Sequence, residues 1–458
     1  MKIAVLNGSP KGDQSATMQS VHFIQKKFPQ HELKIHNVTQ RMKVSDKNDA
    51  AFKEIIDDIK SADGVLWGFP LYFEMVHSQY KRFIELIFES GVQDVFQNKY
   101  AATLSTSIHY FDYTAHNYMN AICDDLDMKY TGSYSADMYD LMKEEERNRL
   151  ALFAEDFFRA IENSVPTAKN YPSLIYSDFQ YIPREVSGKT DAGDKKMVII
   201  TDCDDSQTNL VRMIDRFKGS VSGAVEVINL WDIDIKGGCQ GCIQCGYDNT
   251  CAYTGKDGYI EFYNSRVKTA DVLIYAGAIK DRYLSSRWKL FFDRSFFNTH
   301  TPTLIGKQMG FIISGPLGQI PNLRQILESL AELQQVNLVD FITDECQDSG
   351  EIDALLQNLA ERSIRFSHAH YVKPETFLGV GGRKIFRDDI WGRLRFPFVA
   401  DYNAYKRLGL YDFPQKNRKS RITNSIMIAL STIKGFRKEV SGRMKEEMIK
   451  PHKKVLKD

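Results

Sequence analysis

The chain repeats one pattern of apolar and polar segments at a fixed distance. The segment ADGVLWGFPLYFEMVHSQYKRFIEL begins at Ala62, and ADVLIYAGAIKDRYLSSRWKLFFDR begins 208 positions later at Ala270. The same offset relates KYAATLSTS at Lys99 to KQMGFIISG at Lys307. An internal repeat of this length means that each copy forms the same set of elements, so we expect two domains of one fold.

Each copy alternates short apolar strands with amphipathic helices, which predicts an α/β fold with a parallel sheet and helices on both faces. About five strands per copy fit two tandem flavodoxin-like, doubly wound sheets with the strand order 2-1-3-4-5. We expect four regions: a flavodoxin-like domain at 1–165, a linker at 166–196, a second flavodoxin-like domain at 197–370, and a basic, partly helical extension at 371–458.

A polar loop, NGSPKGDQSAT, follows the first strand of the first copy and precedes a helix. At the carboxyl edge of a parallel sheet, such a loop presents free backbone N–H groups to an anion. Ser9, Ser15 and Thr17 offer hydroxyl donors, and Lys11 adds a positive charge. No GxxxxGK[ST] pattern is present, which disfavours an ATP-type loop, and a polar turn with a helix cap is the alternative to phosphate binding.

Two further loops, GFPLYF at 68–73 and LSTSIHYFDYTAHNY at 104–118, reach the same edge. Together the three loops resemble those of NAD(P)H-dependent FMN reductases and flavodoxin-like quinone reductases. The resemblance implies FMN as cofactor and NAD(P)H as a possible electron donor. It implies a phosphate held by Ser9, Ser15 and Thr17, and a ring system placed against Pro70, Leu71 and Tyr72, with Thr106, Ser107 and His109 nearby. Further side chains that could line the pocket, or be ordinary loop and core residues, are His77, Tyr110, Tyr113 and His116.

The second copy has a different loop at the matching place, TDCDDSQTNL at 201–210. It lacks glycine and contains Asp202, Asp204 and Asp205, whose carboxylates would repel a phosphate dianion. The Pro-Leu-Tyr position has become Ala278-Ile279-Lys280. We expect that this copy has lost its own FMN, with an altered but retained flavin site as the alternative.

The second copy also contains a cysteine segment, GGCQGCIQCGYDNTC, within the interval where it is longer than the first copy. Cys239, Cys242, Cys245 and Cys251 follow the spacing C-x2-C-x2-C-x5-C. Zinc sites usually use two separated cysteine pairs, whereas three closely spaced cysteines and a fourth suit a [4Fe–4S] cluster. The segment resembles that of the iron–sulfur flavoproteins of anaerobes, which implies four cluster ligands. Zinc binding, thiol redox chemistry and inert loop cysteines remain alternatives.

In that family both cofactors belong to one domain, whereas here the flavin motifs and the cysteines are in different copies. We therefore expect a fused pseudo-dimer in which the cysteines of one copy face the FMN of the other. The expected function is FMN-dependent NAD(P)H oxidation with electron transfer to a small molecule or a ferredoxin-like protein. The alternatives are an NAD(P)H:quinone or FMN reductase without a cluster, and a non-catalytic electron carrier or redox sensor.

Composition disfavours a nucleic-acid binder and a transmembrane protein, but it does not identify the partner of the basic tail. The net charge of +1 does not indicate a nucleic-acid binder, and no apolar run is long enough for a transmembrane helix. Seven cysteines without a secretion signal predict a cytoplasmic protein, and a homo-oligomer is possible. Residues 416–458 contain thirteen Lys and Arg and four Asp and Glu, so this tail could bind an acidic protein or an anionic membrane, or remain a solvated helix.

Overall fold

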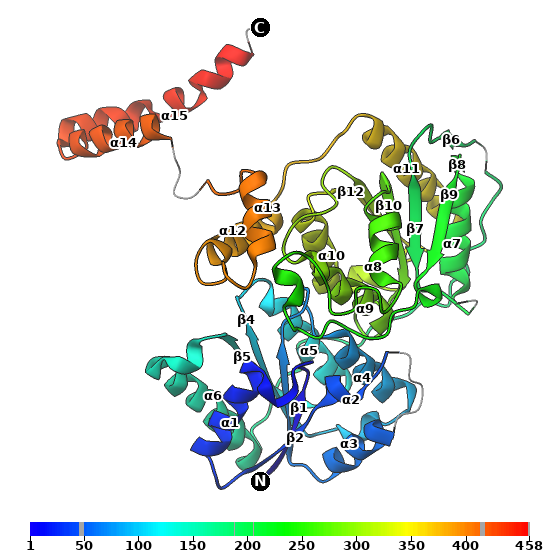
Figure 1. Ribbon diagram of the computed structural model, residues 1–458, viewed down its shortest axis with the longest axis vertical. Coiled ribbons are helices and arrows are strands. Elements are labelled where there is room, and N and C mark those ends of the chain that lie inside the picture. Colours follow the sequence, from blue (N-terminus) through cyan, green and yellow to red (C-terminus); the bar gives the residue numbers. More distant parts are fainter. Residues whose placement is uncertain (45–49, 187, 205, 413–416, 457–458) are drawn as a thin grey trace. The chain divides into compact units, whose positions relative to one another are not determined.

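A computed structural model describes residues 1–44, 50–186, 188–204, 206–412 and 417–456 of the protein. These residues form two compact units, Met1–Ala404 and Tyr405–Asp458. The first unit contains two α/β lobes, which are shown in blue to cyan and in green to yellow (Figure 1). Within the described residues, no helix combines the length and apolar character needed to cross a membrane.

The first lobe is a five-stranded parallel sheet with the order β2-β1-β3-β4-β5. Its strands are β1 (Lys2–Asn7), β2 (Glu32–His36), β3 (Gly64–Pro70), β4 (Tyr100–Ser107) and β5 (Lys129–Asp137). Its helices are α1 (Ala16–Lys27), α2 (Val38–Arg41), α3 (Ala50–Lys60), α4 (Ser78–Glu89), α5 (Asp112–Asp125) and α6 (Glu144–Glu162). The predicted strand order is confirmed. Consecutive parallel strands are joined by helices, which cross one face of the sheet or the other.

The second lobe repeats this order in β12-β11-β10-β7-β9, which is 5-4-3-1-2 when its strands are counted from β7. Its strands are β7 (Met197–Thr201), β9 (Val225–Asn229), β10 (Val272–Ala278), β11 (Gln308–Ser314) and β12 (Asn337–Thr343). Its helices are α7 (Thr208–Gly219), α8 (Tyr259–Phe262), α9 (Ser286–Ser295), α10 (Pro321–Leu333) and α11 (Ser349–His368). The two-residue strands β6 (Thr190–Asp191) and β8 (Val221–Ser222) form a small separate pair.

One hydrophobic core joins the two lobes. It contains Trp67 and Phe83 of the first lobe together with Trp288 and Phe291 of the second. Separate cores lie on the outer faces, under α1 and α6 in one lobe and under α7 and α11 in the other. The helices that follow the third strand of each lobe, α4 and α9, pack against each other at the centre of the shared core.

The α4–α9 contact is reciprocal. The backbone N–H of Ser78 donates to Asp293 Oδ2 over 2.7 Å, and the backbone N–H of Ser286 donates to Glu85 Oε1 over 2.5 Å. Each pair consists of the same two positions of the repeat with the lobes exchanged, as in the isologous interface of a symmetric dimer.

The predicted extension divides into two parts. Helix α12 (Phe377–Trp391) and the start of α13 (Val399–Arg407) belong to the first unit, whereas α14 (Arg418–Leu430) and α15 (Lys434–Val455) belong to the second. The first part contacts both lobes, because Phe386 packs on Tyr110 of the first lobe and Asp401 accepts a hydrogen bond from His300 of the second.

Candidate functional site

The loop after β1 is folded around its own hydroxyl groups. Ser9 is buried, its N–H donates to Asn7 Oδ1 over 2.9 Å, and its Oγ accepts from Lys11 N over 3.2 Å. A side chain at Gly8 would meet Phe69 Cβ at 2.9 Å, so the tight passage of the loop past β3 requires glycine. Ser15 caps the twelve-residue helix α1 by accepting from Met18 N, which leaves a helix N-terminus facing the predicted phosphate site.

The three predicted loops meet at Thr106, near the end of β4. Its hydroxyl lies 2.6 Å from the Thr17 hydroxyl of α1, and its carbonyl accepts from Leu71 N over 3.3 Å. Pro70, the last residue of β3, pairs with Thr106 in the sheet register. The chain therefore holds the predicted phosphate loop and the predicted ring loop together at one carboxyl edge.

Tyr72 begins a tight turn beside this edge. Its N–H and the Met75 carbonyl are 2.8 Å apart, and the two residues between them have positive φ angles. The second lobe has the same turn from Lys280 to Tyr283, also with two residues of positive φ. The Tyr72 ring meets the His77 ring edge-on, with the ring centroids 5.0 Å apart.

Ser107 is the last residue of β4, and His109 lies in the loop that follows it. Ser107 Oγ accepts from His109 N over 2.9 Å, and His109 Nδ1 lies 2.9 Å from Asp112 Oδ2. The Asp112 carboxylate raises the pKa of the half-exposed His109, which favours a positive charge at this edge. His116 is instead a core residue: it is buried between the Thr103 and Ser105 hydroxyls, and burial lowers its pKa to about 4.

The four clustered cysteines line one pocket of the second lobe, together with Tyr253, Arg294, Phe296 and Phe297. All four thiols are free, and Cys245 is the most buried. Arg294 holds the base of the loop, because its guanidinium donates to Asp257 and to the Gly237 carbonyl. Its Nε is buried without a hydrogen-bond partner among the described residues.

No three His, Cys, Asp or Glu side chains among the described residues lie close enough together to hold a single metal ion. The cysteines of an iron–sulfur cluster bind different iron atoms, so their sulfurs lie farther apart than the ligands of one ion. Four thiols around one pocket are the donor set that a [4Fe–4S] cluster uses, and the cluster assignment stays a prediction.

The cysteine loop lies directly against the loops of the first lobe. His77 Nδ1 accepts from Gln79 N over 3.3 Å, so Nε2 carries the proton and donates to the Cys239 carbonyl over 2.9 Å. A side chain at Gly241 would meet the Tyr72 hydroxyl at 2.4 Å and Lys11 Cε at 3.1 Å. His77 thus contacts the cysteine loop, and any larger residue at 241 would displace the Tyr72 side chain from its position.

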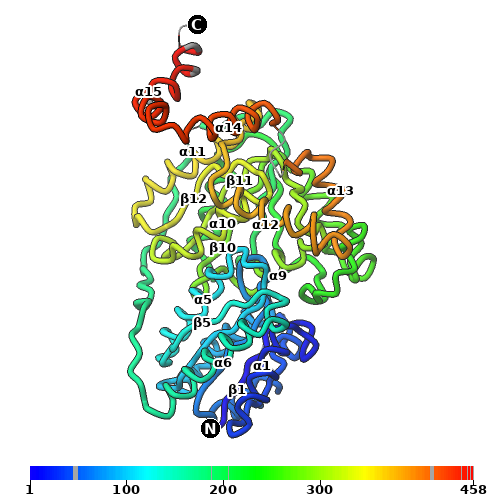
Figure 2. Tube along the Cα trace, turned by 90° about the vertical axis from the view of Figure 1, so that its left-hand side faces the viewer, coloured from blue at the N-terminus to red at the C-terminus, as the bar shows by residue number. Residues whose placement is uncertain are grey.

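The matching edge of the second lobe is covered by the chain's own linker. Asn209, at the start of α7, accepts from Tyr181 N over 2.9 Å and donates to the Phe179 carbonyl over 2.8 Å. Ile175 exchanges two hydrogen bonds of 2.9 Å with the Gln319 side chain after β11. The linker runs as an extended segment along one side of the molecule (Figure 2). The linker therefore contacts the start of α7 and the segment after β11, both of which lie at the carboxyl edge of this lobe.

Two carboxylates of the second lobe accept hydrogen bonds from its own residues at the same edge. Asp344 accepts from Ser314 Oγ, Gly315 N and Asn209 Nδ2 over 2.7–3.0 Å. Asp202 is buried and accepts from Ser285 Oγ, and burial raises its pKa to about 6. Asp205 lies outside the described residues. These contacts occupy polar groups at this edge, and the loss of FMN from the second copy stays a prediction.

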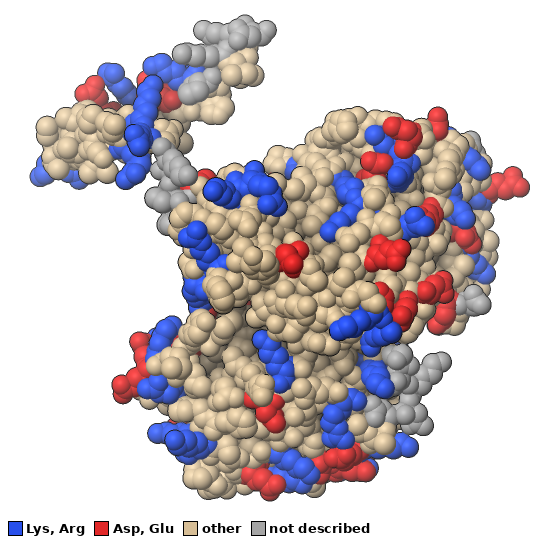
Figure 3. All heavy atoms as spheres, in the orientation of Figure 1, with Lys and Arg blue, Asp and Glu red and all other residues tan. Residues whose placement is uncertain are grey.

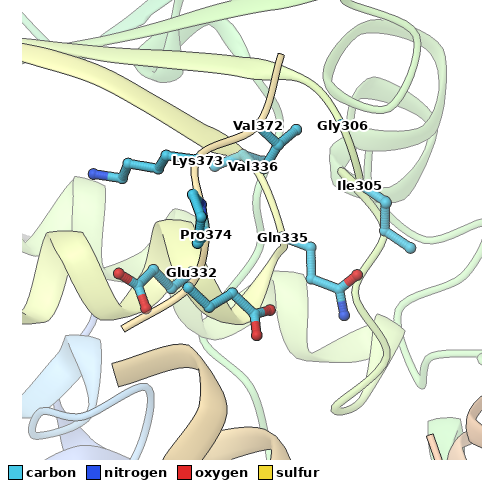
Figure 4. A pocket seen from close by; sticks show the side chains of 9 residues that line it. Ile305, Gly306, Glu332, Gln335, Val336, Val372, Lys373 and Pro374 are labelled. Carbon is cyan, nitrogen blue, oxygen red and sulfur yellow. The ribbon is translucent and has the colours of Figure 1, made fainter. Parts of the chain in front are cut away.

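A second pocket, of about 220 Å³, lies at the opposite edge of the second lobe (Figure 4). It is lined by residues that precede β11 and β12 and by the segment Val372–Glu375. The Lys373 side chain points away from Gln335, and the Glu332 carboxylate is bonded to Thr376 and Gly379 at the start of α12. These contacts are structural, so the pocket carries no chemistry of its own.

Three residues near the site were not predicted: Glu74, Arg294 and Arg393. Arg393 forms a paired contact of 2.6–2.7 Å with Asp137 at the end of β5, which fixes the segment after α12 at the edge of the first lobe. The repeat carried a signal for Arg294, since the matching position of the first copy is the buried Leu86. No sequence signal distinguished Arg393 from the other charges of its aromatic segment.

Residues 1–137 match the family model of NADPH-dependent FMN reductases. This stretch ends with β5 and contains all three loops of the first lobe. The match agrees with the resemblance to FMN reductases in this part of the chain and supports an FMN-dependent NAD(P)H oxidoreductase. Neither the iron–sulfur flavoproteins nor a second copy of the family appears in the match, so both remain predictions.

Several solved structures are similar to the chain at low identity. The NADH:FMN oxidoreductase EMOB, in its apo form, is 18% identical with a TM-score of 0.31, over 35% of this chain and 89% of that one. The NAD(P)H:acceptor oxidoreductase FerB from Paracoccus denitrificans is 17% identical with a TM-score of 0.30, over 35% and 97%. An FMN-dependent NADH-azoreductase from Bacillus anthracis, in complex with FMN, is 17% identical with a TM-score of 0.27, over 36% and 98%. No curated protein matches the chain.

Proposed function

We propose that the first lobe binds one FMN and that the chain uses it to oxidise NAD(P)H. The observation that carries this proposal is the meeting of three loops at Thr106, which contacts Thr17 and Leu71 at one sheet edge. The family match over residues 1–137 supports it. When bound, FMN accepts a hydride from NAD(P)H and can pass electrons on singly or in pairs.

The proposed roles of the residues follow from their positions. The phosphate is held by the loop and helix start that contain Ser9, Lys11, Ser15 and Thr17. Pro70, Leu71 and Tyr72 form one wall of the ring site, and Thr106, Ser107 and His109 form the other. Asp112 raises the pKa of His109 and so favours its positively charged form, which would attract anionic ligands such as a dinucleotide phosphate to this edge.

We also propose that Cys239, Cys242, Cys245 and Cys251 hold a [4Fe–4S] cluster, which when bound would relay single electrons. The shared pocket of the four thiols supports this assignment. Arg294, which lines the same pocket and has an Nε unpartnered among the described residues, supports it as well, because a free N–H near the thiols would donate a hydrogen bond to an anionic group. Gly241 and the Cys239 carbonyl contact Lys11, Tyr72 and His77, so the cysteine pocket adjoins the proposed FMN site.

We further propose that the two lobes are tandem copies arranged as a fused pseudo-dimer. Two observations support it: both sheets have one strand order, and α4 and α9 exchange matching hydrogen bonds. In this arrangement the lobe without a flavin contributes the cysteine loop to the lobe that has one.

Anaerobic purification followed by flavin and iron counts tests the proposal. We expect one FMN and about four irons per chain, and loss of flavin absorbance on addition of NADH or NADPH. The double variant Cys239→Ala/Cys242→Ala should lose iron and keep FMN, whereas Cys346→Ala, an exposed thiol outside the cluster, should keep both. Two FMN and no iron per chain would contradict the two-cofactor arrangement.

A second candidate is an NAD(P)H:quinone or FMN reductase whose cysteines hold no cluster, which the family match also favours. One FMN, no iron after reconstitution and full activity in Cys239→Ala/Cys242→Ala would select it. A third outcome, reduction by dithionite but not by NADH or NADPH, would indicate an electron carrier or redox sensor instead.

A further inference from the structure

The second compact unit leaves its apolar side chains uncovered. In α14 no residue is buried, and Ile422 and Ile426 are 62% and 55% exposed. With Leu430 and Ile433 they recur every three or four residues and so form one stripe along the helix and its end. In α15 a second stripe of exposed residues consists of Met444, Met448 and Val455.

The same unit is strongly basic. Residues 416–458 have a net charge of +9, whereas the rest of the chain has a net charge of −8. Figure 3 shows Lys and Arg side chains along this unit. Arg418, Lys419 and Arg421 lie at the start of α14, where the helix dipole disfavours cations. These three charges therefore do not stabilise the helix. Their position indicates that they interact with an anionic partner outside the chain.

We propose that α14 and α15 bind an anionic phospholipid surface and lie parallel to it. An acidic protein would compensate the positive charge of this unit. It would not by itself bury the exposed isoleucine and methionine stripes, whereas a bilayer interface offers both anionic headgroups and an apolar interior. Ser420 and Asn424 lie on the face of α14 opposite Ile422 and Ile426, and so face water in this orientation together with the exposed Ile428. The thirteen residues of α14 are too few to span a bilayer, so it must lie in the interface.

Flotation of the full chain with vesicles tests this proposal. We expect binding to vesicles that contain phosphatidylglycerol, weaker binding at high salt, and none to phosphatidylcholine alone. The variants Arg418→Glu/Lys419→Glu/Arg421→Glu and Ile422→Ser/Ile426→Ser should each weaken binding about tenfold or more.

Two matched variants serve as controls. Lys26→Glu/Lys27→Glu and Leu152→Ser change exposed residues of α1 and α6 and should bind like the unchanged chain. Circular dichroism of the tail variants with vesicles separates loss of the helix from loss of contact. Absence of binding to anionic vesicles would overturn the proposal. So would full binding by the isoleucine variant, since the contact would then be purely electrostatic and would favour an acidic protein.

Discussion

Glu74 occupies a repeat position that carries opposite charges in the two lobes. Its counterpart Arg282 forms a paired contact of 2.5–2.6 Å with Asp125, whereas Glu74 is buried against Ser329, whose hydroxyl donates to it over 2.6 Å. Both residues have φ of +61° in equivalent turns. Equivalent turns in the two lobes thus each contact the other lobe, one through the Arg282–Asp125 ion pair and the other through the hydrogen bond from Ser329 to Glu74.

Glu74→Gln should stabilise the protein at alkaline pH. Burial raises the pKa of Glu74 to about 8, so the folded state keeps a proton that the unfolded chain loses near its ordinary value of 4.5. Stability contributed by this group therefore falls as the pH rises between these values. Thermal unfolding from pH 5 to pH 9 should show a higher Tm for Glu74→Gln at pH 9 and little difference at pH 5. An equal Tm at both ends would contradict the burial argument.

Gly241→Ala should weaken the junction between the cysteine loop and the first lobe. Gly241 has φ of +62°, and a methyl group there would lie 2.4 Å from the Tyr72 hydroxyl. Gly255→Ala is the matched control, because its φ is +71° and nothing lies within 4 Å of the added atom. Both changes cost about 1–2 kcal/mol of backbone strain, but Gly241→Ala alone should also lower FMN affinity. Equal FMN affinity in the two variants, measured by fluorescence titration, would count against the proposed site.

At the scale of elements, α4 and α9 hold the lobes together through buried charges. Lys81 lies 3.3 Å from Glu85 in α4, and Lys289 pairs with Asp293 four residues later in α9. All four side chains are buried. Buried pairs of this kind add little net stability but strongly penalise the loss of one partner. Each pair lies within one helix, and the two helices are joined because Glu85 and Asp293 also accept from the backbone N–H groups of Ser286 and Ser78.

Asp293→Asn should destabilise the first unit by about 3–5 kcal/mol, since it leaves Lys289 buried without its partner and weakens the bond from Ser78. The comparison is Asp57→Asn in the exposed Lys60–Asp57 pair, which should cost less than about 1 kcal/mol. Urea unfolding followed by tryptophan fluorescence measures both. Similar values for the two variants would mean that the buried Asp293 carboxylate, with its bonds to Lys289 and Ser78, is not a structural constraint.

At the scale of the whole molecule, the chain separates a redox unit from a basic tail. None of the described site residues belongs to Tyr405–Asp458, which forms its own compact unit. A chain that ends after Asp412 should therefore keep its FMN content, its Tm and its NADH oxidation, while losing binding to anionic vesicles. Gel filtration, a flavin count and flotation check these outcomes. Loss of FMN on truncation would show that the tail supports the redox unit.

Much of the fold and part of the site could be predicted from sequence. The 208-residue offset and the alternation of strands and helices predicted two sheets of one order, because local apolar periodicity determines which faces are buried. The three loops of the first lobe could be placed because parallel strands bring their carboxyl ends to one edge. The roles of Gly241, Arg294 and Arg393 could not be predicted, since each depends on contacts with residues distant in the chain.

The sequence by itself determined the two lobes, the strand order and the residue types available at each edge. Only the tertiary structure decided how those edges are used. The linker through Phe179 and Tyr181 covers the edge of the second lobe, and the cysteine loop packs on Tyr72 and His77 of the first. The physical reason is that periodicity records whether a residue is buried, whereas its partner depends on how the shared core brings the two lobes together.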